Sequence, residues 1–294
     1  MRRGYVLGLT VLLAGAIAAC STPTPDSSSS ATPQAASPDT TATPATKVVA
    51  LSSISADLVE TLAGDALVGV AGSRLTAADP RFEGLTVVSQ GRIEPDLEKI
   101  IALEPDLVIG AEGFHDTTLQ RLEELSISTL AYDIDGWSDL DAFTQELALQ
   151  LGVDAAVVSD RYDACLAKAT TSPKSDSALV LVSRQPMLSP NKDSWAGDFL
   201  AQFNINNIAT DWQGESEFSG YVTLSAEKVL EANPSALLVI DTGENTLEQF
   251  QAEPFWGQLK AAQTEQVHTF DYFGLINPGS LASIEDTCEK LGSL

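Results

Sequence analysis

The stretch EKIIALEPDLVI, residues 98–109, returns in altered form as EKVLEANPSALL, residues 227–238. Each copy runs Glu, Lys and two aliphatic residues, then three further residues, a Pro and a mostly apolar segment. This order is typical of a short amphipathic helix that ends before a Pro and leads into a buried strand. The repeat therefore predicts the same helix–strand unit once in each half of the chain.

Short apolar runs alternate with helical stretches around the first copy. The apolar runs are KVVALS, LVGVAG, TVVSQG and PDLVIG, at residues 47–52, 67–72, 86–91 and 105–110. Such βαβα order builds a mostly parallel sheet that is covered by helices. A second block, beginning near Ser177, repeats this order, and it includes TLEQFQAEPFWGQL, residues 246–259, as one expected helix.

Between the two blocks, VDAAVVSDRYDACLAKATTS at residues 153–172 has apolar positions at helical spacing and Asp154 as an N-cap. Taken as one helix of about 17 residues, it is roughly 25 Å long. We therefore expect an α/β fold with two Rossmann-like lobes of mostly parallel sheets, joined by a single long interdomain helix. The lobes are expected at residues 47–152 and 173–294.

The first 46 residues predict export and anchoring. Arg2 and Arg3 precede the apolar run GYVLGLTVLLAGAIA, which is typical of a signal peptide at residues 1–19. IAAC, residues 17–20, resembles a lipobox, in which the signal is cut before Cys20 and this Cys carries lipid. An ordinary signal peptide that ends in Cys is the alternative. Residues 20–46 are rich in Ser, Thr and Pro and are expected to form a disordered tether.

Composition and motifs exclude several classes of protein. The formal net charge of -25 argues against binding to nucleic acid, which needs clustered Lys and Arg. The sequence contains no G-x-S-x-G, no H-E-x-x-H and no Gly-rich phosphate loop, so we expect no enzymatic activity and no cofactor. Two His are too few for a protein that binds bare zinc or manganese.

Two Cys remain besides Cys20. Cys165 and Cys288 would share an oxidising compartment after export, so a disulfide is the obvious pairing. The sequence leaves open whether their Cα atoms come within the bridging distance of about 6 Å.

GRIEPDLEKIIALEPDLVIG at residues 91–110 and SAEKVLEANPSALLVI at residues 225–240 resemble the class III solute-binding lipoproteins that feed ABC importers of ferric siderophores, cobalamin and haem. The resemblance runs over nearly all of residues 47–294 and is greatest to the hydroxamate-siderophore binders. It implies a monomer that carries a ferric siderophore in an interlobe cleft, with cobalamin or haem as the alternative cargo. It also implies that Glu98 and Glu227 dock into Arg pockets of a permease dimer. An adhesion or scaffold lipoprotein and a hydrolase are less favoured.

Oxygen-rich chelates suit arginine and aromatic side chains. The resemblance assigns Arg92 to the iron-binding oxygens, and Arg74 and Arg184 lie at the ends of expected strands; surface ion pairs are the alternative for all three. In the second lobe the aromatic candidates are Trp195, Trp212, Tyr221, Tyr272 and Phe273.

Further candidates lie in the first lobe, where Phe114 takes the place of an expected aromatic hydroxyl and His115 could touch a chelate or ligate haem. In the second lobe, Ser219 takes the place of an expected cleft Trp. His268, Trp137 and Trp256 are interpreted as core residues.

Overall fold

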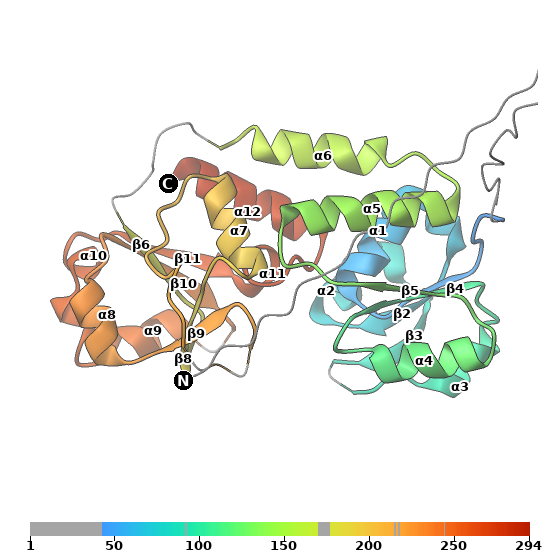
Figure 1. Cartoon of the computed structure of the whole chain (residues 1–294), viewed down its shortest axis with the longest axis horizontal. Coiled ribbons are helices and arrows are strands. Elements are labelled where there is room, and N and C mark those ends of the chain that lie inside the picture. The colour runs from blue at the N-terminus through green and yellow to red at the C-terminus, as the bar shows by residue number, and fades with distance from the viewer. Residues whose placement is uncertain (1–42, 92, 170–176, 215, 217, 244) are drawn as a thin grey trace, which may run out of the picture. The chain divides into compact units, whose positions relative to one another are not determined.

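Five parallel strands form the first sheet of the computed structural model, which describes residues 43–91, 93–169, 177–214, 216, 218–243 and 245–294 (Figure 1). The strand order is β3-β2-β1-β4-β5. The strands are β1 Val48–Ala50, β2 Leu67–Gly72, β3 Thr86–Gln90, β4 Leu107–Ala111 and β5 Thr129–Tyr132. The helices and 3-10 turns of this half are α1 Ser53–Ala63, η1 Gly64–Ala66, α2 Arg74–Ala78, η2 Pro80–Phe82, α3 Leu97–Ala102, α4 Asp116–Glu124, α5 Trp137–Leu151 and α6 Ala156–Leu166.

The second lobe holds a parallel sheet of order β11-β10-β6 and an antiparallel sheet of order β7-β8-β9. Its strands are β6 Ala178–Leu181, β7 Ser183–Arg184, β8 Met187–Pro190, β9 Tyr221–Leu224, β10 Ala236–Asp241 and β11 Val267–Asp271. Its helices and 3-10 turn are α7 Trp195–Gln202, α8 Ala226–Ala232, α9 Thr246–Gln251, η3 Trp256–Gln258, α10 Lys260–Gln263, α11 Tyr272–Leu275 and α12 Leu281–Ser293. The expected α/β class with mostly parallel sheets is confirmed.

The repeated sequence forms the same local structure twice. Asp96 caps α3 and Ser225 caps α8, and each side chain accepts a hydrogen bond from a backbone N–H of the first turn. A left-handed residue follows within two positions of each helix end, Glu104 with φ 49° after α3 and Asn233 with φ 38° after α8, and a Pro comes next. A buried strand then begins, β4 in the first lobe and β10 in the second, as the repeat predicts.

Helix α6 is shorter than expected, because it begins at Ala156 and ends at Leu166, 11 residues in all. Its last residues turn back through bonds from Lys168 N–H to the Cys165 carbonyl and from Ala169 N–H to the Leu166 carbonyl. Ala167, Lys168 and Ala169 follow α6 directly, and the poorer helix formers Thr-Thr-Ser-Pro begin only at residue 170. Asp154 bonds to the N–H of Ala156, although Ala155 occupies the N-cap position.

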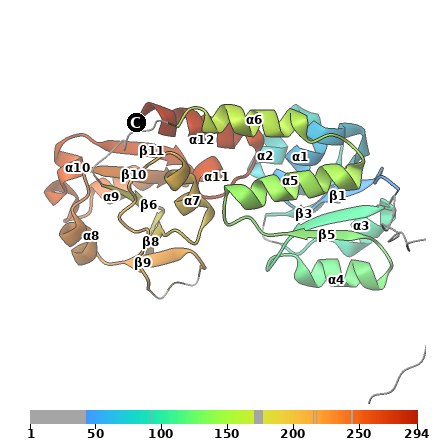
Figure 2. The same ribbon diagram turned by 45° about the horizontal axis from the view of Figure 1, so that its top comes forward.

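Helix α12 packs along α6 and connects the lobes a second time (Figure 2). Arg161 of α6 forms two hydrogen bonds to Glu285 of α12, at 2.6 and 2.8 Å. Lys168 lies 3.1 Å from Glu289, and the sulfur atoms of Cys165 and Cys288 are bonded, with 5.5 Å between the two Cα atoms. We call these three side-chain pairs the α6–α12 seam. The connection between the lobes is therefore a pair of helices, α6 and α12, that are joined by two ion pairs and a disulfide, rather than a single isolated helix.

Two other expectations were wrong in detail. Residues 246–259 do not form one helix, because α9 ends at Gln251 and Pro254 precedes the separate turn η3. Ala45 and Thr46, expected in the tether, are hydrogen-bonded to the first lobe: Ala45 N–H donates to the carbonyl of Gln150 at 2.8 Å, and Thr46 N–H donates to the carboxylate of Asp106 at 2.9 Å.

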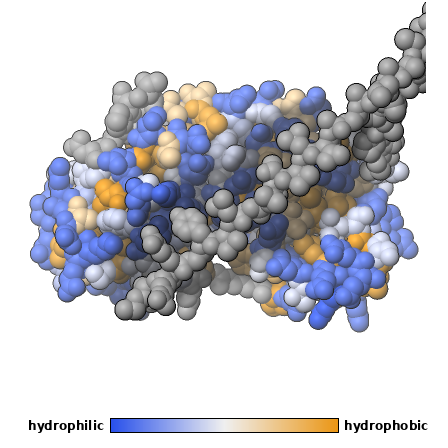
Figure 3. All heavy atoms as spheres, in the orientation of Figure 1, coloured by the Kyte–Doolittle hydropathy of each residue, from blue (hydrophilic) through white to orange (hydrophobic). Residues whose placement is uncertain are grey.

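Polar residues dominate the face seen in Figure 3, in keeping with the high net charge. In the part of the chain that the structure describes, none of the helices combines the length and the apolar character that a membrane span requires.

Candidate functional site

The carboxyl ends of the strands of the first sheet define one wall of the candidate site. The chain runs outward from β1 to β3 and then returns to β4 on the other side of β1, so the topological switch point lies between β1 and β4. Ligands of open α/β sheets bind outside the carboxyl ends at such a point.

Hydroxyl groups line this edge. The phenol of Tyr132 donates to Oγ of Ser52 at 2.6 Å, and Ser53 donates to Ser73 at 2.7 Å. Burial raises the pKa of Tyr132 to about 12, so its hydroxyl is protonated at neutral pH. These residues were missed in the sequence analysis, although each of the three Ser lies just beyond a strand.

The second lobe brings the carboxyl end of β11 against that of β2. Arg74 begins α2 directly after β2, and its Nη2 lies 2.8 and 3.1 Å from the two carboxylate oxygens of Asp271. The guanidinium carbon of Arg74 lies 5.1 Å from the ring centre of Phe273. Two expected site residues, Arg74 and Phe273, are thus together at the junction of the lobes.

Tyr221 and Tyr272 form a second interlobe group with Asp135. Burial raises the pKa of Tyr221, and the neighbouring Tyr272 and Asp135 raise it further. Burial also raises the pKa of Asp135, with smaller contributions from Asp133, Asp139 and the second-lobe Asp193. The expected aromatic residue Tyr221 therefore lies near Tyr272 and near the first-lobe carboxylate of Asp135.

Trp195 is a core residue and not a surface candidate, which corrects the sequence expectation. Its side chain is 3% exposed, its indole N–H donates to the carbonyl of Gly274 at 2.8 Å, and its ring stacks on Trp137. The sequence held a signal for this, because Trp195, Phe199 and Phe203 follow one another at the i, i+4 spacing of a buried helix face. Trp137 and Trp256 are buried as well.

Trp212 and Arg184 are held by charged partners of the second lobe. The Lys228 ammonium lies 4.3 Å from the ring centre of Trp212. Nη1 of Arg184 lies 2.7 Å from the Glu253 carboxylate, so this arginine forms the ion pair considered as its alternative. Arg92 lies outside the described residues, as does Cys20.

Phe114 is 85% exposed in the loop after β4, where a ligand or a partner could reach it. His115, next to it, uses Nδ1 to accept the backbone N–H of Ala111 at 2.9 Å, and burial lowers the pKa of His115. A neutral imidazole that accepts at Nδ1 carries its proton on Nε2, which leaves no lone pair there for a metal. This geometry opposes the expected option of haem ligation by His115.

His268 lies half-buried in β11, and burial lowers the pKa of His268. Among the described residues, no group of three or more His, Cys, Asp or Glu is placed to hold a metal ion.

Glu98 and Glu227 occupy equivalent positions, each the second residue of its helix after the N-cap. Both side chains are exposed, and neither is in an ion pair within the described parts of the chain. In the view of Figure 1, α3 and α8 lie in different lobes, on the side away from α6. A carboxylate near a helix N-terminus is favoured by the helix dipole, which gives each Glu a local structural role as well.

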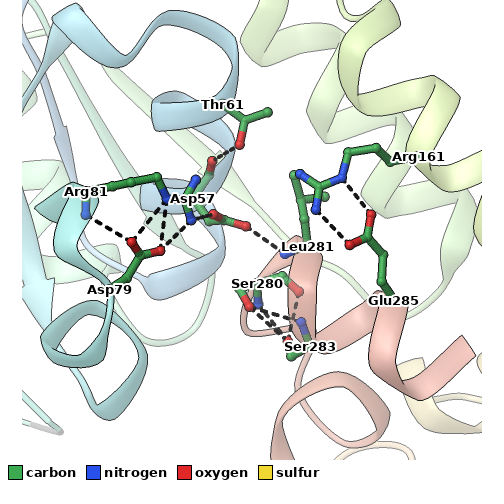
Figure 4. A network of polar contacts seen from close by, with 9 residues as sticks. All are labelled: Asp57, Thr61, Asp79, Arg81, Arg161, Ser280, Leu281, Ser283 and Glu285. Carbon is green, nitrogen blue, oxygen red and sulfur yellow. Dashed lines mark hydrogen bonds and ion pairs between the residues drawn. The ribbon is translucent and has the colours of Figure 1, made fainter. Parts of the chain in front are cut away.

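A polar network behind the site ties the two lobes together (Figure 4). The buried Asp57 of α1 forms an ion pair with Arg81, which also binds Asp79. The other carboxylate oxygen of Asp57 accepts the N–H of Leu281, the first residue of α12, at 2.6 Å. The sequence pattern did not predict the interlobe role of Asp57, because a single Asp among the apolar residues of α1 gives no sign of its partners.

Comparison with known proteins gives a consistent picture. The family model described as "Periplasmic binding protein" matches residues 48–272. The Fe(3+) dicitrate-binding periplasmic protein FecB of Escherichia coli (strain K12) is 26% identical over 186 residues, which are 61% of this chain and 60% of that protein. A cobalamin-binding protein of Halobacterium salinarum is 28% identical over 183 residues, 59% of this chain and 48% of that one. The aligned region thus spans less than two thirds of both relatives.

The fold of a periplasmic binding protein from Veillonella parvula is similar as well. Its crystal structure superposes with a TM-score of 0.71 at 15% identity, over 86% of this chain and 91% of that chain. At this level of identity the likeness concerns the fold alone.

Proposed function

The chain belongs to the periplasmic binding protein family, and we propose that it is the solute-binding component of an ABC importer with a ferric siderophore as its ligand. Periplasmic binding proteins are carriers and not enzymes, so no reaction is assigned to the chain. The ligand class and the importer are our inferences. They draw support from the site and from what the relatives are named to bind.

The observation that carries this proposal is the meeting of strand ends from two lobes. Arg74 after β2 contacts Asp271 at the end of β11, so the carboxyl ends of both parallel sheets border one interlobe region. Ligands of such folds bind at these ends. Arg74, Phe273, Tyr221 and Tyr272 supply the donors and aromatic surface that an iron chelate would use.

Ferric siderophore is the first candidate, and cobalamin is the second because one relative is named a cobalamin-binding protein. Haem is less favoured, since the hydrogen bond from Ala111 to His115 opposes axial ligation by this residue. Arg92 remains a proposed contact through the family resemblance alone.

We further propose that residues 1–19 are a signal peptide, that Cys20 carries lipid and that the following Ser/Thr/Pro stretch is a tether to the membrane. All of these lie outside the described residues except the end of the tether. Glu98 and Glu227 are proposed to dock into Arg pockets of a permease dimer, because two equivalent carboxylates on two similar lobes match a twofold partner.

A fluorescence titration tests the ligand class. Tryptophan emission of the purified protein is followed during titration with ferric hydroxamate, ferric catecholate, haem and cyanocobalamin. We expect saturable quenching by one ferric siderophore. The gallium complex of the same siderophore, which has the same shape and charge but quenches weakly, should compete for the site. Absence of saturable binding for the whole panel would favour an adhesion or scaffold protein.

A further inference from the structure

Arg74 and Asp271 form an ion pair between the two lobes, and its geometry is well defined. Asp271 is itself held in place, because its Oδ1 accepts the N–H of Phe273 at 2.8 Å. Only Nη2 of Arg74 bonds to this carboxylate. In the described parts of the chain, Nε and Nη1 of Arg74 make no hydrogen bond.

The pair borders a pocket of about 480 Å³ that residues of both lobes line. Arg74 and Lys290 are its basic residues, and Asp271 and Asp286 are its acidic ones, so the charges of its lining cancel. Phe273 adds an aromatic wall. An interlobe pocket with hydrogen-bond donors but no net positive charge is an unusual receptor for an anion.

The remaining interlobe charges strengthen this conclusion. Burial raises the pKa of Asp135, and the negative charges of Asp133, Asp139 and the second-lobe Asp193 raise it further. Arg184, the other arginine at a strand end, is neutralised by Glu253. The described interlobe residues thus offer little positive charge to a ligand.

Stability does not explain the Arg74–Asp271 pair. The side chains are 59% and 52% exposed, and ion pairs at such exposure contribute little to the free energy of folding. Their main effect is on the local potential: Asp271 cancels the charge of Arg74 and leaves the N–H groups of Nε and Nη1 available. Such donors suit the oxygen atoms of a neutral chelate, whereas an anionic chelate would also meet the carboxylate.

We propose that Asp271 is a specificity-determining residue, which makes the interlobe site favour iron chelates or corrinoids of zero or positive net charge over anionic ones. This inference rests on the proposed function, because it concerns the ligand of the same site. It also separates this chain from its relative named for Fe(3+) dicitrate, an anionic complex.

The variant Asp271→Asn tests the proposal, with affinities for ferric dicitrate and for a neutral ferric trihydroxamate measured by titration calorimetry. Freeing one positive charge near the ligand should lower the ratio of the dicitrate Kd to the trihydroxamate Kd by about tenfold. Glu104→Gln is the matched control. It removes one negative charge from the Lys47–Glu104 pair, which lies by the start of β1, at the opposite edge of the sheet.

An unchanged ratio in Asp271→Asn, or an equal change in Glu104→Gln, would overturn the proposal. Tighter binding of dicitrate than of trihydroxamate by the wild type would overturn it too. Should Asp271→Asn fail to fold, Asp271→Ser keeps an acceptor for the N–H of Phe273 and replaces it in the test. If the wild type binds no chelate and no cobalamin, the proposed function itself fails, a result distinct from an altered preference.

Discussion

The carboxylate of Asp57 accepts a hydrogen bond at 2.6 Å from the backbone N–H of Leu281, which lies 224 residues further along the chain. Asp57 belongs to α1 of the first lobe, and Leu281 begins α12 (Figure 4). The first N–H groups of a helix lack hydrogen-bond partners within the helix. A buried carboxylate at this point accepts a hydrogen bond from one of them, and the positive end of the helix dipole stabilises its negative charge. The start of α12 is thereby fixed to the first lobe, while the α6–α12 seam holds its later turns.

Replacement of Asp57 by Asn should destabilise the protein by about 2 kcal/mol, because the buried ion pair to Arg81 is lost while Arg81 keeps Asp79. The free energy of unfolding in urea, followed by circular dichroism, measures this loss. Asp106→Asn is the matched control, since Asp106 is an exposed carboxylate that caps backbone N–H groups within one lobe. An equal decrease in the free energy of unfolding in both variants would show that Asp57, which connects the lobes, stabilises the protein no more than a carboxylate that acts within one lobe.

The disulfide between Cys165 and Cys288 should contribute about 5 kcal/mol in the chain-entropy model, because it links residues 123 positions apart in the unfolded chain. Cys288→Ser should therefore lower the urea midpoint strongly. Because the two sulfur atoms are bonded to each other, neither Cys should react with a thiol reagent in the native protein. A count of free thiols in denaturant without reductant checks the bond directly. Cys165 and Cys288 should contribute no free thiol to this count, and a contribution of two would contradict the pairing.

The Arg161–Glu285 pair should make stability depend on pH. Hydrogen bonding to Arg161 lowers the pKa of Glu285 below its ordinary value. A carboxyl group whose pKa is lower in the folded state stabilises that state above its unfolded pKa, about 4.3 for Glu, and the contribution is lost as pH falls through the folded pKa.

The difference in unfolding free energy between wild type and Glu285→Gln should therefore be present at neutral pH and shrink below about pH 4. Urea unfolding at a series of pH values measures it. A difference that stays constant down to pH 3 would mean that the ion pair does not titrate with folding. Glu289→Gln, which perturbs the more exposed pair with Lys168, is the comparison for the same helix.

Local patterns predicted the elements of this fold well. Three local signals act within a few residues of each other: the Pro within each copy of the repeat, the helix caps and the apolar runs. They predicted the α/β class and the two helix–strand units, α3–β4 and α8–β10. The break of the helix at Pro254 was also readable from the sequence, and was overlooked.

Contacts between distant residues could not be predicted in the same way. Arg74 and Asp271 are 197 positions apart, and the sequence gives no measure of which carboxylate an arginine meets. The same holds for Asp57 and Leu281. Trp195 shows the intermediate case, because its helical spacing with Phe199 indicated a core position while its type suggested a ligand contact.

The double variant Glu98→Ala with Glu227→Ala should retain its affinity for the chelate and lose importer-dependent uptake, because both side chains are exposed on α3 and α8 and are proposed to meet permease arginines. Uptake of radioactive iron as the chelate by whole cells, beside a fluorescence titration of the purified protein, measures both properties. Glu231→Ala removes a similar exposed charge from α8 and should transport normally. A double variant with weakened chelate binding would place these carboxylates in the ligand site or the fold. Uptake at the wild-type rate would show that the importer recognises another surface.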